Sequence, residues 1–229
     1  MEDISSLEKK IGLTFTNRDL LRQAMVHRSY LNENPGFKIG HNERLEFLGD
    51  AVLELVVTKY LYENYDNPEG ELTNWRASLV NSRMLSEASQ KVGLNAHLYL
   101  SKGEEKDQNG KARQYILANA FEALIGAIYL DRGLDVASDF IHRHILSSLK
   151  SILAEKRYLD PKSKFQEAAQ ERSGITPSYR TISEVGPDHD KHFVIGVYLG
   201  DELIAKGEGS SKQEAQVAAA AAGLETKGW

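Results

Sequence analysis

One stretch of the chain limits the possible folds more than any other. From Tyr115 to Leu130 nearly every residue is apolar, and the only strongly polar residues are Asn119 and Glu122. A helix that is apolar on all sides must be covered by protein on all sides. The stretch is shorter than the roughly 20 apolar residues that a membrane-spanning helix needs. It therefore predicts a buried central helix and no membrane partner.

The two polar residues of this predicted helix need an explanation. An unpaired buried carboxylate is costly, so Glu122 requires a partner, which is either an arginine or a cation shared with other acidic residues. Asn119 lies one helical turn earlier on the same face. It either forms a hydrogen bond to a neighbouring helix or takes part in the same cation site.

A second predicted helix, over residues 42–65, carries three carboxylates near its start. Glu43, Glu46 and Asp50 are spaced i, i+3 and i+7, so they lie within an arc of roughly 60°. Like charges at such spacing repel each other, and a bound cation would turn this repulsion into ligation. Carboxylate oxygens are hard ligands that suit Mg²⁺ or Mn²⁺. The alternative is a solvated acidic face, which the apolar residues recurring along the same helix disfavour.

The periodicity of the sequence changes near residue 160. Every element predicted before this point is a helix. After it come a helix with Asp160 as its cap and Pro161 in its first turn, three strand-like runs and an alanine-rich helix. We therefore predict an all-α domain over residues 1–157, a short linker over residues 158–159, and a small α+β domain of order α-β-β-β-α over residues 160–229. The expected boundaries include helices over 17–26, 71–80, 83–92, 135–156 and 212–224, a polar loop over 103–110, and strands over 179–185, 192–199 and 202–207.

Charge and cysteine content exclude some kinds of site. The chain has no cysteine, which excludes disulfides and thiolate metal sites and favours a reducing, cytoplasmic location. Its first residues lack the basic and apolar regions of a signal peptide. The net charge is −5, and neither part is basic: Lys and Arg number 18 against 22 Asp and Glu up to residue 155, and 10 against 11 after it. Any contacts to nucleic-acid phosphates must therefore come from local clusters of basic residues.

Several stretches together resemble one known family. The segment Asn42-Glu43-Arg44-Leu45-Glu46-Phe47-Leu48-Gly49-Asp50-Ala51-Val52-Leu53 resembles the signature of the ribonuclease III family. Further segments resemble other parts of that family, namely His27-Arg28-Ser29-Tyr30, Glu69-Gly70-Glu71-Leu72 and the stretch over residues 118–127. The tail, from Pro161-Lys162-Ser163 through Gly186-Pro187-Asp188-His189 to Ser211-Lys212, resembles a double-stranded-RNA-binding domain. The resemblance covers almost the whole chain, in the bacterial arrangement of one nuclease domain followed by one RNA-binding domain.

The resemblance implies a homodimeric, Mg²⁺-dependent endoribonuclease, with Mn²⁺ as a substitute metal and no small-molecule cofactor. Such an enzyme hydrolyses phosphodiester bonds in double-stranded RNA and leaves 5′-phosphate and 3′-hydroxyl ends with short 3′ overhangs. Ribosomal RNA precursors and other RNA undergoing processing, including mRNA, are the expected substrates. Divalent cations can activate the water, clamp the phosphate oxygens and neutralise the leaving oxygen, so no His or Lys base is required.

Carried over by position, the resemblance assigns roles to seven residues of the first domain. Two of them, Glu43 and Glu69, would line an acidic valley at the dimer interface. Phe47 corresponds to an aromatic residue that inserts into a pocket of the partner subunit. The metal-binding and catalytic residues would be Glu46, Asp50, Asn119 and Glu122.

The chain departs from the family pattern at position 119, where the family usually has Asp. The amide of Asn119 keeps one carbonyl oxygen but lacks the negative charge. We therefore expect weaker metal binding or a higher Mg²⁺ requirement. The alternative is a cleavage-impaired homologue that still binds double-stranded RNA.

The predicted RNA-binding tail must recognise A-form RNA through 2′-hydroxyls and phosphates, because the bases lie in a deep, narrow groove. Gln166 and Glu167 are expected to contact 2′-hydroxyls, and His189 is expected to enter the minor groove. Ser211 and Lys212 are expected to bind phosphates at a helix N-terminus. The family favours a second basic residue after Lys212, where this chain has Gln213, so we expect modest affinity with a shallow salt dependence. The alternative for these residues is a solvated surface without a ligand.

Overall fold

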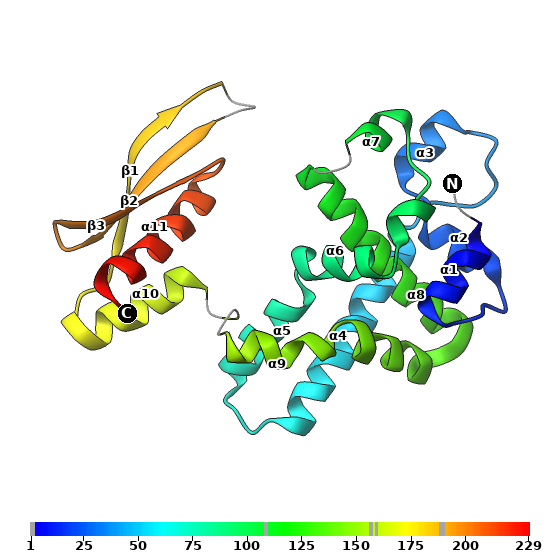
Figure 1. Ribbon diagram of the computed structural model, residues 1–229, viewed down its shortest axis with the longest axis horizontal. Coiled ribbons are helices and arrows are strands. Elements are labelled where there is room, and N and C mark those ends of the chain that lie inside the picture. The colour runs from blue at the N-terminus through cyan, green and yellow to red at the C-terminus, as the bar shows by residue number, and fades with distance from the viewer. Residues whose placement is uncertain (1–2, 108–109, 156–157, 159, 188–190) are drawn as a thin grey trace. The chain divides into compact units, whose positions relative to one another are not determined.

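The computed structural model describes residues 3–107, 110–155, 158, 160–187 and 191–229. The chain separates into two compact units, Met1–Tyr158 and Leu159–Trp229, and each has its own hydrophobic core (Figure 1). Among the described residues, no helix has both the length and the hydropathy that crossing a membrane requires.

The described part of the first unit is helical, apart from one isolated bridge between Val26 and Tyr99. Its elements are α1 (Ile4–Ile11), α2 (Arg18–Ala24), α3 (Arg28–Glu33), α4 (Glu43–Asn64), α5 (Glu69–Val80), α6 (Ser82–Lys91), the 3₁₀ turn η1 (Leu94–His97), α7 (Lys102–Lys106), α8 (Lys111–His144), the 3₁₀ turn η2 (Leu146–Ser148) and α9 (Leu149–Ala154).

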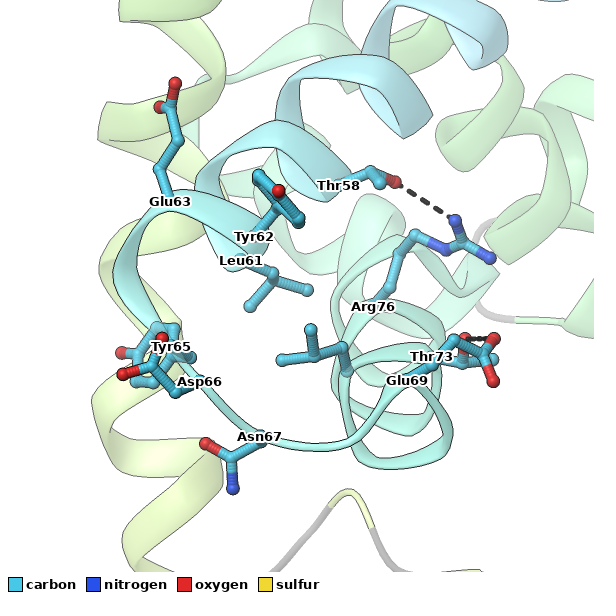
Figure 2. A pocket seen from close by; sticks show the side chains of 11 residues that line it. Thr58, Leu61, Tyr62, Glu63, Tyr65, Asp66, Asn67, Glu69, Thr73 and Arg76 are labelled. Atoms are coloured by element: carbon cyan, nitrogen blue, oxygen red, sulfur yellow. Dashed lines mark hydrogen bonds between the residues drawn. The ribbon is translucent and has the colours of Figure 1, made fainter.

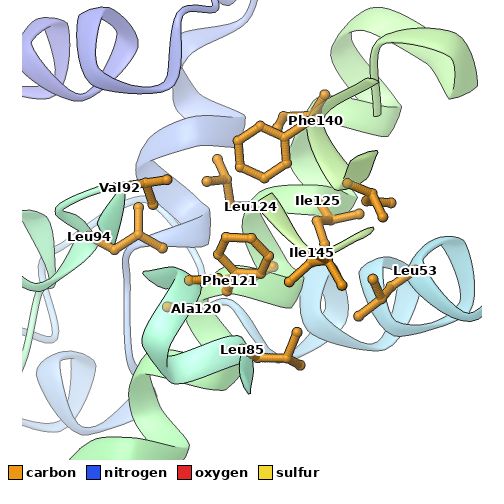
Figure 3. Packing of buried hydrophobic residues seen from close by; sticks show 14 of the residues in the cluster. Leu53, Leu85, Val92, Leu94, Ala120, Phe121, Leu124, Ile125, Phe140 and Ile145 are labelled. Atoms are coloured by element: carbon orange, nitrogen blue, oxygen red, sulfur yellow. The ribbon is translucent and has the colours of Figure 1, made fainter. Parts of the chain in front are cut away.

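The core of the first unit forms around α8, as the apolar stretch predicts. Phe121, Leu124 and Ile125 of this helix are completely buried, and Phe121 packs 5.5 Å from the ring of Phe140 (Figure 3). The most extensive contact between any two elements is the one that joins α8 to α4. The helix with the three carboxylates therefore packs directly on the buried helix with Asn119 and Glu122.

Two glycines allow α4 and α8 to cross with their backbones in contact. A Cβ atom on Gly49 of α4 would collide with the carbonyl oxygen of Glu122, and it would lie 2.6 Å from the carbonyl carbon. A Cβ on Gly126 of α8 would collide in turn with the carbonyl oxygen of Leu45. Any larger residue at either position would push the two helices apart.

Two expected boundaries in the first unit are wrong. The stretch expected to be a loop over 103–110 contains the short helix α7, because Ser101 caps it and accepts a hydrogen bond from the Glu104 N–H at 3.3 Å. The helix expected over 135–156 is separated from the preceding helix as expected, but it ends at His144 and is followed by η2 and α9. The break falls at Gly133, whose φ of +83° interrupts the helical path within α8.

The second unit has the predicted order α-β-β-β-α. Its elements are α10 (Pro161–Ser173), β1 (Ser178–Val185), β2 (His192–Leu199), β3 (Glu202–Gly209) and α11 (Lys212–Lys227), and the strands form an antiparallel sheet in the order β1-β2-β3. Asp160 caps α10 as expected, with its carboxylate accepting from the Ser163 N–H at 3.1 Å. The sheet packs closely on α11, since a Cβ on Gly207 would collide with the α11 backbone beside Ala219. The alanines of α11 permit this close approach.

Candidate active site

The first carboxylate of the α4 row, Glu43, is an exposed side chain held by two basic groups. Its carboxylate lies 3.3 Å from the Arg28 guanidinium and 3.7 Å from Nδ1 of His41. Arg28 is the first residue of α3, so the segment 27–30 touches the signature helix at this point. Glu43 also lies in the first turn of α4, where the helix dipole favours negative charge.

Glu46 of α4 lies near Asn119 of α8. Burial raises the pKa of the Glu46 carboxyl, and the charges of Glu43 and Asp50 raise it further, while a hydrogen bond from the Asn119 side chain acts in the opposite direction. The Asn119 side chain therefore lies close enough to the Glu46 carboxyl to affect its pKa, across the contact between α8 and α4. Its role as a metal ligand or as a hydrogen-bond partner between the helices stays a prediction.

Among the residues of the candidate site, Glu122 has the most strongly raised pKa. Burial raises the pKa of its carboxyl to about 8, with further contributions from the negative charges of Asp50, Glu46 and Glu54. Within the described part of the chain, no cation forms an ion pair with Glu122. The possibility of an arginine partner is therefore wrong, and the neighbours of Glu122 are other carboxylates.

This arrangement has the donor chemistry for a divalent cation. Glu46, Asp50 and Glu122 supply hard carboxylate oxygens, and Asn119 adds an amide oxygen. The mutual repulsion seen at Glu46 and Glu122 is what a bound cation would relieve. As the side chains stand, no group of three or more His, Asp or Glu among the described residues is close enough to hold a metal ion. The residues therefore fit a metal in chemistry but do not form a complete ligand set in this conformation.

The structure adds one acidic residue that the sequence analysis did not single out. Glu54 lies one turn beyond Asp50 on α4, and its carboxylate is 3.0 Å from Nε of Arg76 on α5. Arg76 also donates from Nη1 to Oγ1 of Thr58 at 3.0 Å (Figure 2). The signal was present in the sequence, because Glu54 continues the helical spacing of Glu46 and Asp50.

A cavity of about 810 Å³ lies next to Arg76 and Thr58, between the second half of α4 and α5 (Figure 2). Its lining combines apolar and aromatic side chains with charged and polar ones. Glu69, the first residue of α5, is part of this lining and accepts a hydrogen bond from Thr73 at 2.9 Å. The lining residues are Thr58, Leu61, Tyr62, Glu63, Tyr65, Asp66, Asn67, Glu69, Leu72, Thr73 and Arg76.

Phe47 points away from the protein core. Its side chain is 80% exposed, and Leu55 and Tyr62 of the same helix are 56% and 80% exposed. Helical spacing places these residues in one row along α4. An exposed row of large apolar side chains is typical of a surface that another protein covers.

In the second unit, the described residues that are predicted to contact RNA lie on α10 and at the start of α11. Gln166 and Glu167 are exposed on α10. Ser211 is the N-cap of α11. Its hydroxyl oxygen accepts a hydrogen bond from the Glu214 N–H at 3.2 Å, so this oxygen already has a partner in the helix backbone. Lys212 is exposed, and its ammonium lies 3.3 Å from the Glu184 carboxylate. His189 lies outside the described residues.

Comparison with known proteins identifies relatives of both units. The family model described as Ribonuclease-III-like matches residues 17–149, and the model of the double-stranded RNA binding motif matches residues 161–227. The protein named Ribonuclease 3 of Dehalococcoides mccartyi is 40% identical over 98% of this chain and 95% of its own length. The Ribonuclease 3 of Oceanobacillus iheyensis is 42% identical over 98% of each chain.

Solved structures agree with these matches for the first unit. A nuclease domain of ribonuclease III from Campylobacter jejuni, described for flexibility in a region involved in dimer formation, superposes with a TM-score of 0.57. It is 38% identical, and the match covers 63% of this chain and 97% of that domain.

Proposed function

The chain belongs to the ribonuclease III family, and from this premise we propose that it is an endoribonuclease that hydrolyses phosphodiester bonds in double-stranded RNA by metal-ion catalysis. The observation that carries the proposal is the crossing of α4 and α8. It brings Asn119 and Glu122 of the buried helix against Glu46 and Asp50 of the signature helix. A cluster of carboxylates that repel one another is unfavourable in the absence of a cation.

In this proposal, Glu46, Asp50, Asn119 and Glu122 hold Mg²⁺, for which Mn²⁺ can substitute. When bound, the metal supplies a more acidic water and stabilises charge on the phosphate and the leaving oxygen. The chain itself fixes the positions of the four side chains on two rigid helices. The Asn119 amide lies near Glu46, and burial raises the pKa of Glu122 to about 8, so a cation held there would favour the ionised form of this carboxyl. Glu43 and Glu69 would border the path of the RNA.

The products expected from this chemistry have 5′-phosphate and 3′-hydroxyl ends. If the protein is a homodimer, the two sites cut opposite strands and leave short 3′ overhangs. Ribosomal RNA precursors and other RNA in processing, including mRNA, are the substrates that we propose, and the cytoplasm is the proposed location. Residues 1–157 would form the catalytic domain and residues 160–229 the RNA-binding domain, with a linker at 158–159.

We further propose that Phe47 inserts into the 810 Å³ cavity of a second copy of the chain. Phe47 is exposed on one part of α4, while the cavity lies along the other part of α4 and α5. In a twofold-symmetric dimer, each subunit would offer one Phe47 and one cavity, so two equivalent contacts would form. The apolar side chains in the cavity lining, which include Leu61 and Leu72, suit an aromatic ring.

For the second domain, we propose that Gln166 and Glu167 contact 2′-hydroxyls and that Lys212 contacts a phosphate. Exposure of all three side chains supports these roles. His189 keeps its proposed role in the minor groove on the basis of the family resemblance alone. Ser211 is proposed to contact RNA through its hydroxyl hydrogen, since its oxygen is engaged by the helix.

A cleavage-impaired RNA-binding protein is the second candidate, and Asn119 is the observation that favours it. The amide of Asn119 lies near Glu46 but adds no negative charge. One assay separates the two candidates: incubation of a long RNA duplex with Mg²⁺ or Mn²⁺, beside a Glu122→Gln variant as the inactive reference. Cleavage by the wild type in either metal supports the enzyme and rules out the second candidate. An intact duplex in both metals, with a mobility shift, rules out the enzyme.

A further inference from the structure

Two lysines from distant parts of the second unit bind the same carboxylate. Lys191 precedes β2 and Lys212 begins α11, while Glu184 belongs to β1. The Lys191 ammonium lies 3.0 Å from Oε1 of Glu184, and the Lys212 ammonium lies 3.3 Å from Oε2. Each oxygen of one carboxylate therefore receives one ammonium group.

The two ammonium groups are held in place, and the side chains of Lys191 and Lys212 are 32% and 59% exposed. Lys212 also extends over the ring of Phe193, with its nitrogen 5.6 Å from the ring centroid. Phe193 is buried in the domain, so it gives Lys212 a rigid support. The hydrogen bonds from Lys191 and Lys212 lower the pKa of the Glu184 carboxyl, so the carboxylate keeps its charge at neutral pH.

The neighbouring helix N-terminus offers little to an anion by itself. Ser211 accepts from the Glu214 N–H, and the Glu214 carboxylate accepts from both the N–H and the hydroxyl of Ser210, at 3.0 and 2.6 Å. A phosphate arriving there would meet the negative charge of Glu214. Gln213, which follows Lys212, adds no positive charge. The positive side-chain charge near this end of α11 comes from lysines.

We propose that Lys191 and Lys212 together form a site for a backbone phosphate of double-stranded RNA. Lys191 would supply, from the base of the β1–β2 hairpin, the second positive charge that Gln213 does not provide. A phosphodiester group presents two anionic oxygens, as a carboxylate does, and the position of Glu184 shows that both ammonium groups can converge on one such pair. Each ammonium has three N–H donors, so it can bind a phosphate oxygen while it keeps its contact with Glu184. This inference rests on the proposed RNA contact of Lys212.

The test is the affinity of the full chain for a duplex RNA, measured by fluorescence anisotropy over a range of salt concentrations in the presence of a chelator. The variants are Lys191→Gln, Lys212→Gln and the charge-preserving Lys191→Arg. Lys227→Gln is the matched control. Lys227 also pairs with a glutamate, Glu202 at 3.2 Å, but it ends the same helix, about 22 Å along its axis from Lys212.

We expect Lys191→Gln and Lys212→Gln each to weaken binding by about 3–10-fold at low salt and to reduce the slope of log affinity against log salt by about 1. Lys191→Arg and Lys227→Gln should retain the wild-type slope. If Lys212→Gln weakens binding and Lys191→Gln matches the control, the role of Lys191 is wrong while the proposed function stands. If Lys191→Arg loses affinity like Lys191→Gln, a positive charge is not what matters and the inference is again wrong. A wild type that does not bind the duplex would overturn the proposed function itself.

Discussion

Gly49 and Glu122 lie in direct backbone contact, and this contact positions the candidate active site. A Cβ on Gly49 would be 2.6 Å from the carbonyl carbon of Glu122 and would collide with its oxygen. Asp50 follows Gly49 directly, so the carboxylate-bearing turns of α4 and α8 are placed against each other. The distance between the acidic side chains is thus controlled by two residues that have no side chain of their own, Gly49 and Gly126.

Replacing Gly126 with Ala should damage both stability and activity. The new Cβ would collide with the Leu45 carbonyl oxygen and lie 3.1 Å from the Gly49 nitrogen. Overpacking of this kind costs about 1–3 kcal/mol of unfolding free energy, and a displacement near 1 Å at a reacting centre can cost about 100-fold in rate. Urea unfolding and duplex cleavage rates measure the two effects. Gly36→Ala, with no atom within 4 Å of the added Cβ, is the control and should change neither.

An Asn119→Asp variant should bind metal more tightly. It adds a carboxylate beside Glu46 and Glu122, where the chain has an amide. We expect a lower Mg²⁺ concentration for half-maximal cleavage, and also tighter Mn²⁺ binding in the absence of RNA, measured by electron paramagnetic resonance. Asn67→Asp, on the loop between α4 and α5, is a control that adds the same charge away from α8. If Asn119→Asp and Asn67→Asp shift Mn²⁺ binding equally, the account of position 119 is wrong.

The stability of the metal-free protein should fall as pH rises through the neutral range. The pKa of Glu122 is raised from 4.5 to about 8 in the folded chain, so between these values the folded state holds more protons than the unfolded state. The free energy of unfolding therefore decreases with pH over this window. Glu122→Gln should remove part of the decrease, by about 1–3 kcal/mol at pH 8 after allowance for solvent screening.

Chemical unfolding with a chelator, at pH 5 and pH 8, measures the effect for the wild type and for Glu122→Gln. The difference between the two proteins should be larger at pH 8. Mg²⁺ or Mn²⁺ should stabilise the wild type most at the higher pH, where it competes with the fewest protons. Equal pH dependence in the two proteins would show that Glu122 is not the responsible group.

Removal of the Phe47 ring should weaken self-association. Large aromatic residues that fill a partner pocket typically contribute 2 kcal/mol or more, which corresponds to about 30-fold or more in the dissociation constant. Sedimentation equilibrium of Phe47→Ala measures this change. Tyr115→Ala is the control, since Tyr115 is a 57% exposed aromatic residue on α8 rather than on the apolar row of α4. A dimer unaffected by Phe47→Ala would show that the cavity beside α5 has another occupant.

Local signals in the sequence were sufficient for most helices and strands, and they failed where apolar periodicity was absent. The helix α7 was missed because its five residues are charged or Gly and bury nothing, so only the cap at Ser101 indicates it. The gap expected before residue 135 corresponds to the non-helical Gly133, whereas the end of α8 at His144 was missed. In the candidate site, Glu54 was overlooked although its spacing from Asp50 is helical.

The sequence by itself determined the fold class and the family, because helical periodicity and a long signature are properties of neighbouring positions. Only the tertiary structure decided that, among the described residues, Glu122 has carboxylate neighbours instead of an arginine, that Asn119 lies near Glu46, and that Lys191 and Lys212 converge on Glu184. The first two contacts join α4 to α8, and Lys212 joins α11 to β1, so these bring together residues that are far apart along the chain, whereas Lys191 is only seven residues from Glu184. Their distances depend on how closely helices and strands pack, which the contact of Gly49 with Glu122 sets in the first unit and that of Gly207 with α11 sets in the second.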